Sequence, residues 1–364
     1  ILIFLIINSL WLSNSPPRPI QIGVIAPLTG PLATIGKYIQ EGLLLAQEDI
    51  NANGGIQGRE VQLRYEDSVV DPKLSVNAFL KLVTLDDVKV VIGDYRSPNT
   101  LALAPLAEEY HVILISPGSQ SDTISTAGEY VFRTQVTAAR EAEALARYLL
   151  DNRIEEVSTL VTDQDYGIDF ERRFAQFYTS RSGNIKGTYR AATTEKDYRT
   201  ILLRVKQDSV GALVLAIGGS AAGLVAQQAT ELGLDLRFFA SSIVQTEDLL
   251  TVGRSSVEGL TYIYPYDNSM QEEAQRDFSL RYKERFGKEN DVIAANSYDA
   301  LMLIAAAMEV CNEDATCIKE RLYTVKSYAG ASGVLSFDEN GDVDKPLTIK
   351  RVEGSKFVTV QRVY

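Results

Sequence analysis

The sequence alternates short apolar segments, rich in Val, Ile and Leu, with longer segments that have the apolar periodicity of amphipathic helices. Such strand–helix–strand alternation predicts parallel sheets with helices on both faces and right-handed crossovers. It is typical of a doubly wound, three-layer α/β fold. Strands are expected at 20–27, 61–67, 88–94 and 111–116, and helices at 37–52, 75–86 and 99–110.

The alternation restarts near residue 138, which predicts a second α/β unit. Two helical segments, 272–287 and 292–310, follow that unit without a complete sheet of their own. The economical arrangement is that the chain crosses back, so that these helices cover the first unit. Two lobes with several crossings imply a hinge and a cleft that can hold a ligand. Strands of the second unit are expected at 157–163, 184–192, 212–218 and 237–242, and helices at 138–152, 167–181, 199–208 and 221–233.

The charge and the histidine content narrow the possible functions. The 364-residue chain has a net charge of -12, which argues against nucleic acid as a partner because phosphates are bound by Lys and Arg. The one histidine, His111, is expected at a strand edge. It cannot form a zinc site with two scattered cysteines, and no second histidine is present for a Ser–His pair. The sequence therefore predicts no cofactor, no metal site and no enzyme activity.

The first residues indicate export. Residues 1–12, ILIFLIINSLWL, form an apolar run, and a Pro-rich linker follows at 14–19. The run is short for a membrane span, which needs about 20 residues, and it suits the hydrophobic region of a signal peptide. An uncleaved N-terminal membrane anchor is the alternative. Either interpretation places the protein in the periplasm or outside the cell.

Cys311 and Cys317 are separated by a short polar loop in the segment VCNEDATCIK. In an exported protein we favour a disulfide that closes a turn between two helices. Two free buried thiols are the alternative. The spacing excludes a CxxC redox motif.

Two neighbouring strands are followed by hydroxyl-rich turns, GDYRSPNT at 93–100 and SPGSQSD at 116–122. Ser97 or Asn99 could cap the helix that follows the first turn. A helix N-terminus also presents free N–H groups and a positive dipole end to a ligand carboxylate. A GxSxG nucleophile turn does not fit, because only Gly118 is in place. Together the two turns predict a polar pocket at one edge of the sheet.

The segment VTDQDYGIDF follows a strand of the second unit. Tyr166, which precedes Gly167, is expected to project into the cleft, where its ring and hydroxyl could hold a small zwitterion. Asp163 and Asp165 are either acid–base carboxylates or negative charges at a helix N-terminus.

Two other motifs do not have the residue spacing of the nucleotide- or calcium-binding loops that they resemble. The glycines of GVIAPLTGPLATIGKY, which follow the first strand, match neither a dinucleotide-binding loop nor a P-loop. The segment DENGDVDK at 338–345 lacks the glycine position and the closing Glu of a calcium loop. Its Asn340-Gly341 pair predicts a hairpin turn instead.

Taken together, these segments resemble the type I periplasmic binding proteins, in particular the leucine/isoleucine/valine-binding branch. The resemblance covers roughly residues 20–360, and it is carried by IGVIAPLTGPLATIGK, VVIGDYRSPNT, ILISPGSQSD, DQDYGIDF and SGVLSFDENGDV. It implies a clamshell with three crossings between the lobes and a role as the solute receptor of an ATP-driven (ABC) importer, without catalysis. The expected division is 1–19 as signal peptide or anchor plus linker, 20–136 with 265–334 as lobe 1, and 137–264 with 335–364 as lobe 2.

The resemblance also implies which residues bind the ligand. Ser97 matches a serine that binds the ligand carboxylate, and Tyr166 would close on the ligand from lobe 2. Around Ser119, Gln120 and Ser121, amides and side chains are expected to contact the carboxylate and the ammonium. Ser119 and Gln120 replace the Ala and Thr that are usual there, so selectivity is expected to differ. The remaining candidates are Ser242 and Tyr298.

Ser242 marks the main departure from the family pattern. Branched-chain binders carry an acidic residue near this position, which pairs with the ligand ammonium. Because a buried ammonium without a partner is costly, either another carboxylate such as Asp165 substitutes, or the ligand is not an α-amino acid.

The leading hypothesis is an exported receptor for a branched-chain or other hydrophobic amino acid, or a related small carboxylate, with an ABC permease as its partner. A ligand-sensing ectodomain or regulator of the same fold, which binds a small amide or organic acid, is the alternative.

Overall fold

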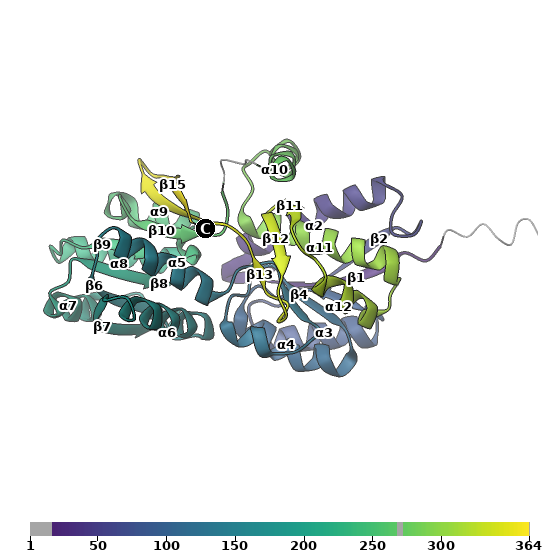
Figure 1. Cartoon of the computed structure of the whole chain (residues 1–364), viewed down its shortest axis with the longest axis horizontal. Coiled ribbons are helices and arrows are strands. Elements are labelled where there is room, and N and C mark those ends of the chain that lie inside the picture. Colours follow the sequence, from purple (N-terminus) through teal and green to yellow (C-terminus); the bar gives the residue numbers. More distant parts are fainter. Residues whose placement is uncertain (1–16, 268–271, 364) are drawn as a thin grey trace, which may run out of the picture.

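The computed structural model describes residues 17–267 and 272–363, which form two α/β lobes (Figure 1). The first lobe contains a five-stranded sheet in the order β2-β1-β3-β4-β5. All of its pairings are parallel, and β3 and β4 are buried along their whole length, as expected for strands covered on both faces. Its strands are β1 (Ile20–Ala26), β2 (Val61–Asp67), β3 (Val90–Ile92), β4 (Ile113–Ser116) and β5 (Val131–Arg133).

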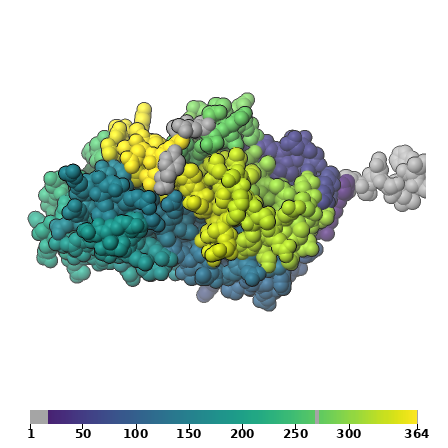
Figure 2. Space-filling model, in the orientation of Figure 1, coloured from purple at the N-terminus to yellow at the C-terminus, as the bar shows by residue number. Residues whose placement is uncertain are grey.

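The second lobe contains a seven-stranded sheet in the order β15-β14-β10-β9-β8-β6-β7. Five of these strands are parallel, whereas β14 is antiparallel to both β10 and β15. The strands are β6 (Glu156–Thr162), β7 (Asn184–Ala191), β8 (Ala212–Ala216), β9 (Arg237–Ala240), β10 (Thr261–Tyr264), β14 (Leu347–Glu353) and β15 (Lys356–Val363). In the space-filling view the two lobes meet without a gap on the face shown (Figure 2).

Helices cover both sheets, and the long helices that follow the second unit do return to the first. The first lobe carries α2 (Ala33–Ala52), α3 (Pro72–Thr84), α4 (Ser97–Tyr110), α10 (Glu273–Phe286), α11 (Val292–Cys311) and α12 (Ala315–Tyr323). The second carries α5 (Ala138–Asp151), α6 (Asp165–Thr179), α7 (Arg199–Asp208), α8 (Gly219–Glu231) and α9 (Glu247–Gly253). In the part of the chain that the structure describes, four short 3₁₀ helices complete these elements: η1 (Gly30–Leu32), η2 (Asp122–Thr126), η3 (Ser242–Val244) and η4 (Arg254–Val257).

Helix α11 is apolar and long enough, by length and composition, to cross a membrane, but 83% of its most apolar stretch is buried inside the protein. It packs closely on α2. A side chain at Gly42 of α2 would place its Cβ 2.1 Å from the carbonyl oxygen of Ala294, so the glycine permits the close approach. These contacts indicate a core helix of lobe 1.

The chain passes between the lobes three times: between β5 and α5, between β10 and α10, and between β13 and β14. This agrees with the predicted three crossings. The last crossing follows a small sheet made of β11 (Tyr328–Gly330), β12 (Gly333–Phe337) and β13 (Val343–Asp344). The hairpin predicted at Asn340-Gly341 is confirmed, because β12 and β13 pair antiparallel on either side of it.

The small sheet lies against lobe 1. The carbonyl oxygen of Gly341 accepts a hydrogen bond from the N–H of Arg133 (3.1 Å), and the rings of Phe337 and Phe132 are 5.5 Å apart. Residues 335–344 therefore contact the first sheet, although the sequence places them in lobe 2. We propose that the third crossing lies between Asp344 and Leu347.

His111 does not lie at a strand edge. It follows the last residue of α4 in the left-handed conformation, with φ 52°, and β4 begins two residues later, at Ile113. The helix thus ends at a position that the apolar pattern of HVILIS assigns to a strand. The imidazole packs edge-on against the ring of Tyr130, with 5.3 Å between the ring centroids.

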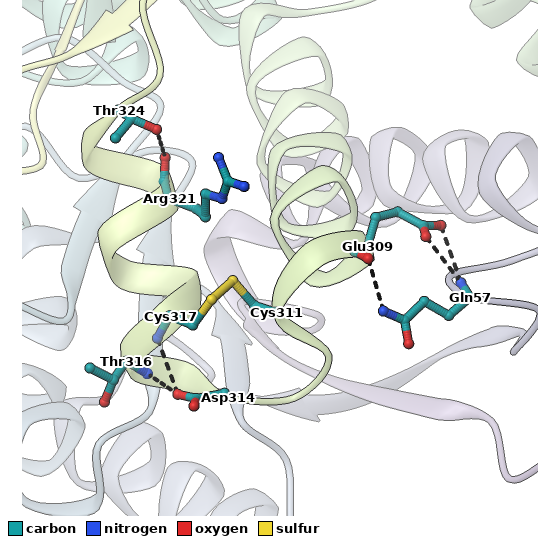
Figure 3. Close-up of a disulfide and its surroundings, with 8 residues drawn as sticks. All are labelled: Gln57, Glu309, Cys311, Asp314, Thr316, Cys317, Arg321 and Thr324. Carbon is teal, nitrogen blue, oxygen red and sulfur yellow. Dashed lines mark hydrogen bonds between the residues drawn. A yellow bond between two sulfur atoms is a disulfide. The ribbon is translucent and has the colours of Figure 1, made fainter.

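Cys311 and Cys317 are joined by a disulfide (Figure 3). It links the last residue of α11 to α12, as predicted for a turn between two helices. Asp314 caps α12 within this turn by accepting hydrogen bonds from the N–H groups of Thr316 (3.0 Å) and Cys317 (3.1 Å). The cross-link and the cap together hold the turn.

Candidate functional site

Ser97 is the first residue of α4, just beyond the buried strand β3. The N-cap position is Arg96, so the prediction that Ser97 or Asn99 caps this helix is wrong. The Ser97 Oγ accepts hydrogen bonds from the N–H groups of Gln120 (3.2 Å) and Ser121 (3.1 Å). Because the oxygen already accepts two bonds, its hydroxyl hydrogen remains available to donate.

The amides of the turn after β4 donate to side chains of this turn and of the neighbouring one. The N–H of Ser119 donates to Ser116 Oγ (3.0 Å), and Ser119 Oγ lies 2.7 Å from Thr100 Oγ1. The next two amides, as described above, donate to Ser97. These three N–H groups were expected to face a ligand carboxylate, but that of Ser119 is bonded to Ser116, and those of Gln120 and Ser121 position the Ser97 hydroxyl.

Three of the predicted ligand-binding residues converge on a carboxylate that the sequence did not single out, Glu141. Gln120 Nε2 donates to Glu141 Oε1 (2.7 Å). The Tyr166 hydroxyl (3.0 Å) and the Ser242 N–H (3.3 Å) both donate to Glu141 Oε2. Glu141 lies in the first turn of α5, directly after the first crossing, while its donors come from the turn after β4, from α6 and from η3. Both lobes therefore contribute to one polar cluster.

Glu141 is fully buried, and this sets the electrostatics of the cluster. Burial raises the pKa of Glu141 from 4.5 to about 7, although the hydrogen bonds that it accepts lower it in part. Burial and the nearby Glu141 charge also raise the pKa of Tyr166 well above its usual value, so the phenol stays protonated and donates. Within the described part of the chain, Glu141 forms no ion pair with a lysine or arginine.

Tyr95 borders the same cluster. Burial raises the pKa of Tyr95 to about 12, and the charges of Asp291 and Glu141 add to the effect. A Cβ at Gly118 would lie 2.2 Å from the Tyr95 ring, so the glycine of the SPGSQSD turn makes room for this tyrosine. The side chain of Tyr95 remains partly exposed.

Direct bonds join the lobes beside the cluster. Ser121 Oγ donates to Asp169 Oδ2 of α6 (2.6 Å). One residue later, Asp122 Oδ2 accepts from Arg173 Nε (2.7 Å). Ser121, a predicted ligand-binding residue, thus bonds to the other lobe in this conformation.

Two predicted candidates lie outside the cluster. The Tyr298 hydroxyl donates to Asp49 Oδ2 (2.6 Å) and accepts from Arg281 Nη2 (3.2 Å), so it joins α11 to α2 and α10. Asp165 lies in the first turn of α6, as the interpretation of helix N-terminal charge predicts. The carboxylate that reaches Ser242 is Glu141 and not Asp165.

One signal could have identified Glu141 from the sequence. It occupies the apolar face of an amphipathic helix, on which Ala138, Ala142 and Leu145 are also buried. A carboxylate at such a position is rarely buried without a role. Tyr95 has no comparable signal, because its neighbours in GDYRSPNT are already polar.

Comparisons with known proteins give a consistent family. Residues 19–356 match the family described as periplasmic binding protein. The Leu/Ile/Val-binding protein homolog 3 of Brucella melitensis biotype 1 is 27% identical over 334 residues, which covers 90% of this chain and 89% of that protein. The Leu/Ile/Val-binding protein of Escherichia coli (strain K12) is 26% identical over 326 residues, with 89% and 88% covered.

Solved structures match over nearly the whole chain. The leucine binding protein LivK from Thermotoga maritima has a TM-score of 0.90 at 26% identity, covering 94% of this chain and 98% of that one. A solute binding protein of an ABC transporter from R. palustris, in complex with benzoate, has a TM-score of 0.85 at 17% identity, with 94% and 96% covered. The second match shows a shared fold.

Proposed function

The chain belongs to the periplasmic binding protein family, and from this premise we propose that it is the exported solute-binding receptor of an ABC importer. Its ligand would be an amino acid or a related small carboxylate, held between the lobes. A membrane permease would recognise the closed form, since a ligand that binds this form better shifts the open–closed equilibrium toward it.

The observation that carries this proposal is the convergence of both lobes on Glu141. Gln120 reaches it from lobe 1, and Tyr166 and Ser242 reach it from lobe 2. A polar cluster buried at the junction of two lobes is where a clamshell receptor contacts its ligand from both sides. The relatives named for binding leucine, isoleucine and valine support an amino acid as ligand.

Two features support export. The apolar run at residues 1–12 suits a signal peptide, and it lies outside the described residues. The disulfide between Cys311 and Cys317 suits an oxidising compartment. Whether the N-terminal segment is cleaved or anchors the protein is tested by N-terminal sequencing of the mature protein.

The test is thermal and chemical unfolding in the presence of a ligand panel. The panel contains the twenty common amino acids, short organic acids, aromatic carboxylates and small amides. A ligand present at 100 times its Kd should add about 2.7 kcal/mol to the free energy of unfolding. The proposal is contradicted if no member of the panel stabilises the protein and no small molecule is released from it on denaturation.

A further inference from the structure

The contacts of Glu141 suit its charged form. At the atoms that touch it, Gln120 Nε2 and Ser242 N can only donate, and the Tyr166 hydroxyl donates as well. A neutral carboxyl would carry a hydrogen of its own, which Gln120 Nε2 and the Ser242 N–H cannot accept, so only a hydroxyl such as that of Tyr166 could take it. Two donor-only groups and a hydroxyl that can donate thus surround the carboxyl, and this set favours the carboxylate anion.

No lysine or arginine of the described residues is bonded to this anion. Glu141 is 0% exposed, and a buried charge is costly unless it is paired. Lys345 is close enough to interact with its charge, but the Lys345 ammonium donates to Asn296 and interacts first with Asp299. Across residues 17–267 and 272–363, no lysine or arginine forms an ion pair with Glu141. A cationic group on the ligand would supply the missing partner.

Ser97 provides the complementary end of the site. Its hydroxyl hydrogen is free to donate, because its oxygen already accepts from two amides. Gln120 connects the two ends: its main-chain N–H donates to Ser97, and its side chain donates to Glu141. The acceptor and the donor are thus one glutamine residue apart, so a single small zwitterion can contact both.

We propose that Glu141 pairs with the ammonium group of the ligand, which is therefore an α-amino acid and not a carboxylate without an amine. This inference rests on the proposed function and specifies its ligand class. The position differs from the one that the family resemblance implies, an acidic residue near Ser242. Here the main chain at Ser242 donates to a carboxylate from the first turn of α5.

The experiment is isothermal titration calorimetry with matched ligand pairs. Each of the twenty common amino acids is compared with the carboxylate of the same skeleton that lacks the amine, such as L-leucine with 4-methylpentanoate, and benzoate is added. For the tightest-binding amino acid, the matching carboxylate should bind about 100-fold more weakly. Glu141→Gln should lose about the same factor for the amino acid and little for the carboxylate.

Glu143→Gln is the matched control, because Glu143 lies on the same helix and forms a partly exposed pair with Arg147. It should bind the amino acid as the wild type does. In the Glu141→Gln background, Ser242→Asp introduces a carboxylate at the residue whose N–H bonds to Glu141, and it should restore at least tenfold of the lost affinity.

The inference is overturned if Glu141→Gln binds the amino acid as tightly as the wild type. It is also overturned if carboxylates without an amine bind while amino acids do not, and that result leaves the proposed receptor function intact. If neither class binds, the inference is overturned, and the proposed function falls with it when no other panel member binds and no small molecule is released on denaturation.

Discussion

Replacing Glu141 by glutamine should stabilise the ligand-free protein at neutral and higher pH. The substitution keeps the size of the side chain and removes a charge that is fully buried. Burial raises the pKa of Glu141 from 4.5 to about 7, and this difference corresponds to about 3 kcal/mol.

The sign of the effect follows from proton linkage. The folded protein holds the Glu141 proton more tightly than the unfolded chain does, so this group contributes stability that is fully present below pH 4.5. That stability is lost as the pH rises from 4.5 to about 7. Glutamine has no such loss, although the Ser242 N–H then lacks a carboxylate acceptor at a cost of about 1 kcal/mol. At pH 8 the variant should therefore be about 2 kcal/mol more stable than the wild type, and at pH 4.5 it should have no advantage.

The assay is urea unfolding of protein from which ligand has been removed by refolding, measured at several pH values between 4.5 and 8. Glu143→Gln should stay within about 0.5 kcal/mol of the wild type, because its carboxylate forms a partly exposed pair. If Glu141→Gln is no more stable than the wild type at pH 8, the buried charge is already compensated within the protein. That result would contradict the claim that the Glu141 charge destabilises the ligand-free protein.

Three further predictions concern Ser97, Tyr298 and the disulfide. Ser97→Ala should weaken binding of the tightest-binding panel ligand by about tenfold or more. It should also lower the free energy of unfolding by about 1–3 kcal/mol, because the Gln120 N–H loses its acceptor. Unchanged affinity in calorimetry would rule out a contact between Ser97 and the ligand. Tyr298→Phe should leave ligand affinity unchanged and lower the free energy of unfolding by about 1 kcal/mol, since the Tyr298 hydroxyl bonds to Asp49. A tenfold loss of ligand affinity in this variant would show that Tyr298 contributes to the binding site. Reduction of the disulfide between Cys311 and Cys317 should lower the free energy of unfolding by about 2 kcal/mol, as expected for a short closed loop. Equal denaturation midpoints with and without reductant would contradict this prediction.

The sequence predicts the helices and strands of the fold well, because apolar residues recur with a different spacing in helices than in strands. Buried parallel strands such as β3 and β4 appear as short apolar runs, and the Asn340-Gly341 turn is marked by residues that tolerate its backbone conformation. The lobe to which the segment 335–344 belongs is harder to predict. Strand pairing joins residues that are far apart in the chain, and no local pattern shows which sheet a hairpin contacts.

The site was predicted less completely, for two physical reasons. Helix α11 is buried on nearly all sides, so its sequence does not show which way Tyr298 points. A charged residue on the apolar face of α5 is visible, but only the fold brings Gln120, Tyr166 and Ser242 to Glu141. The amides of the SPGSQSD turn were assigned to the ligand because a sequence cannot show that a side chain of another turn already accepts from them.

A crystal structure of the protein with the tightest-binding member of the panel tests the account most directly. We predict a ligand between the lobes with its amine nitrogen about 3 Å from a carboxylate oxygen of Glu141, and with its carboxylate accepting from the Ser97 hydroxyl. A ligand bound outside the cleft, or one in the cleft that places no cationic group beside Glu141, would contradict it.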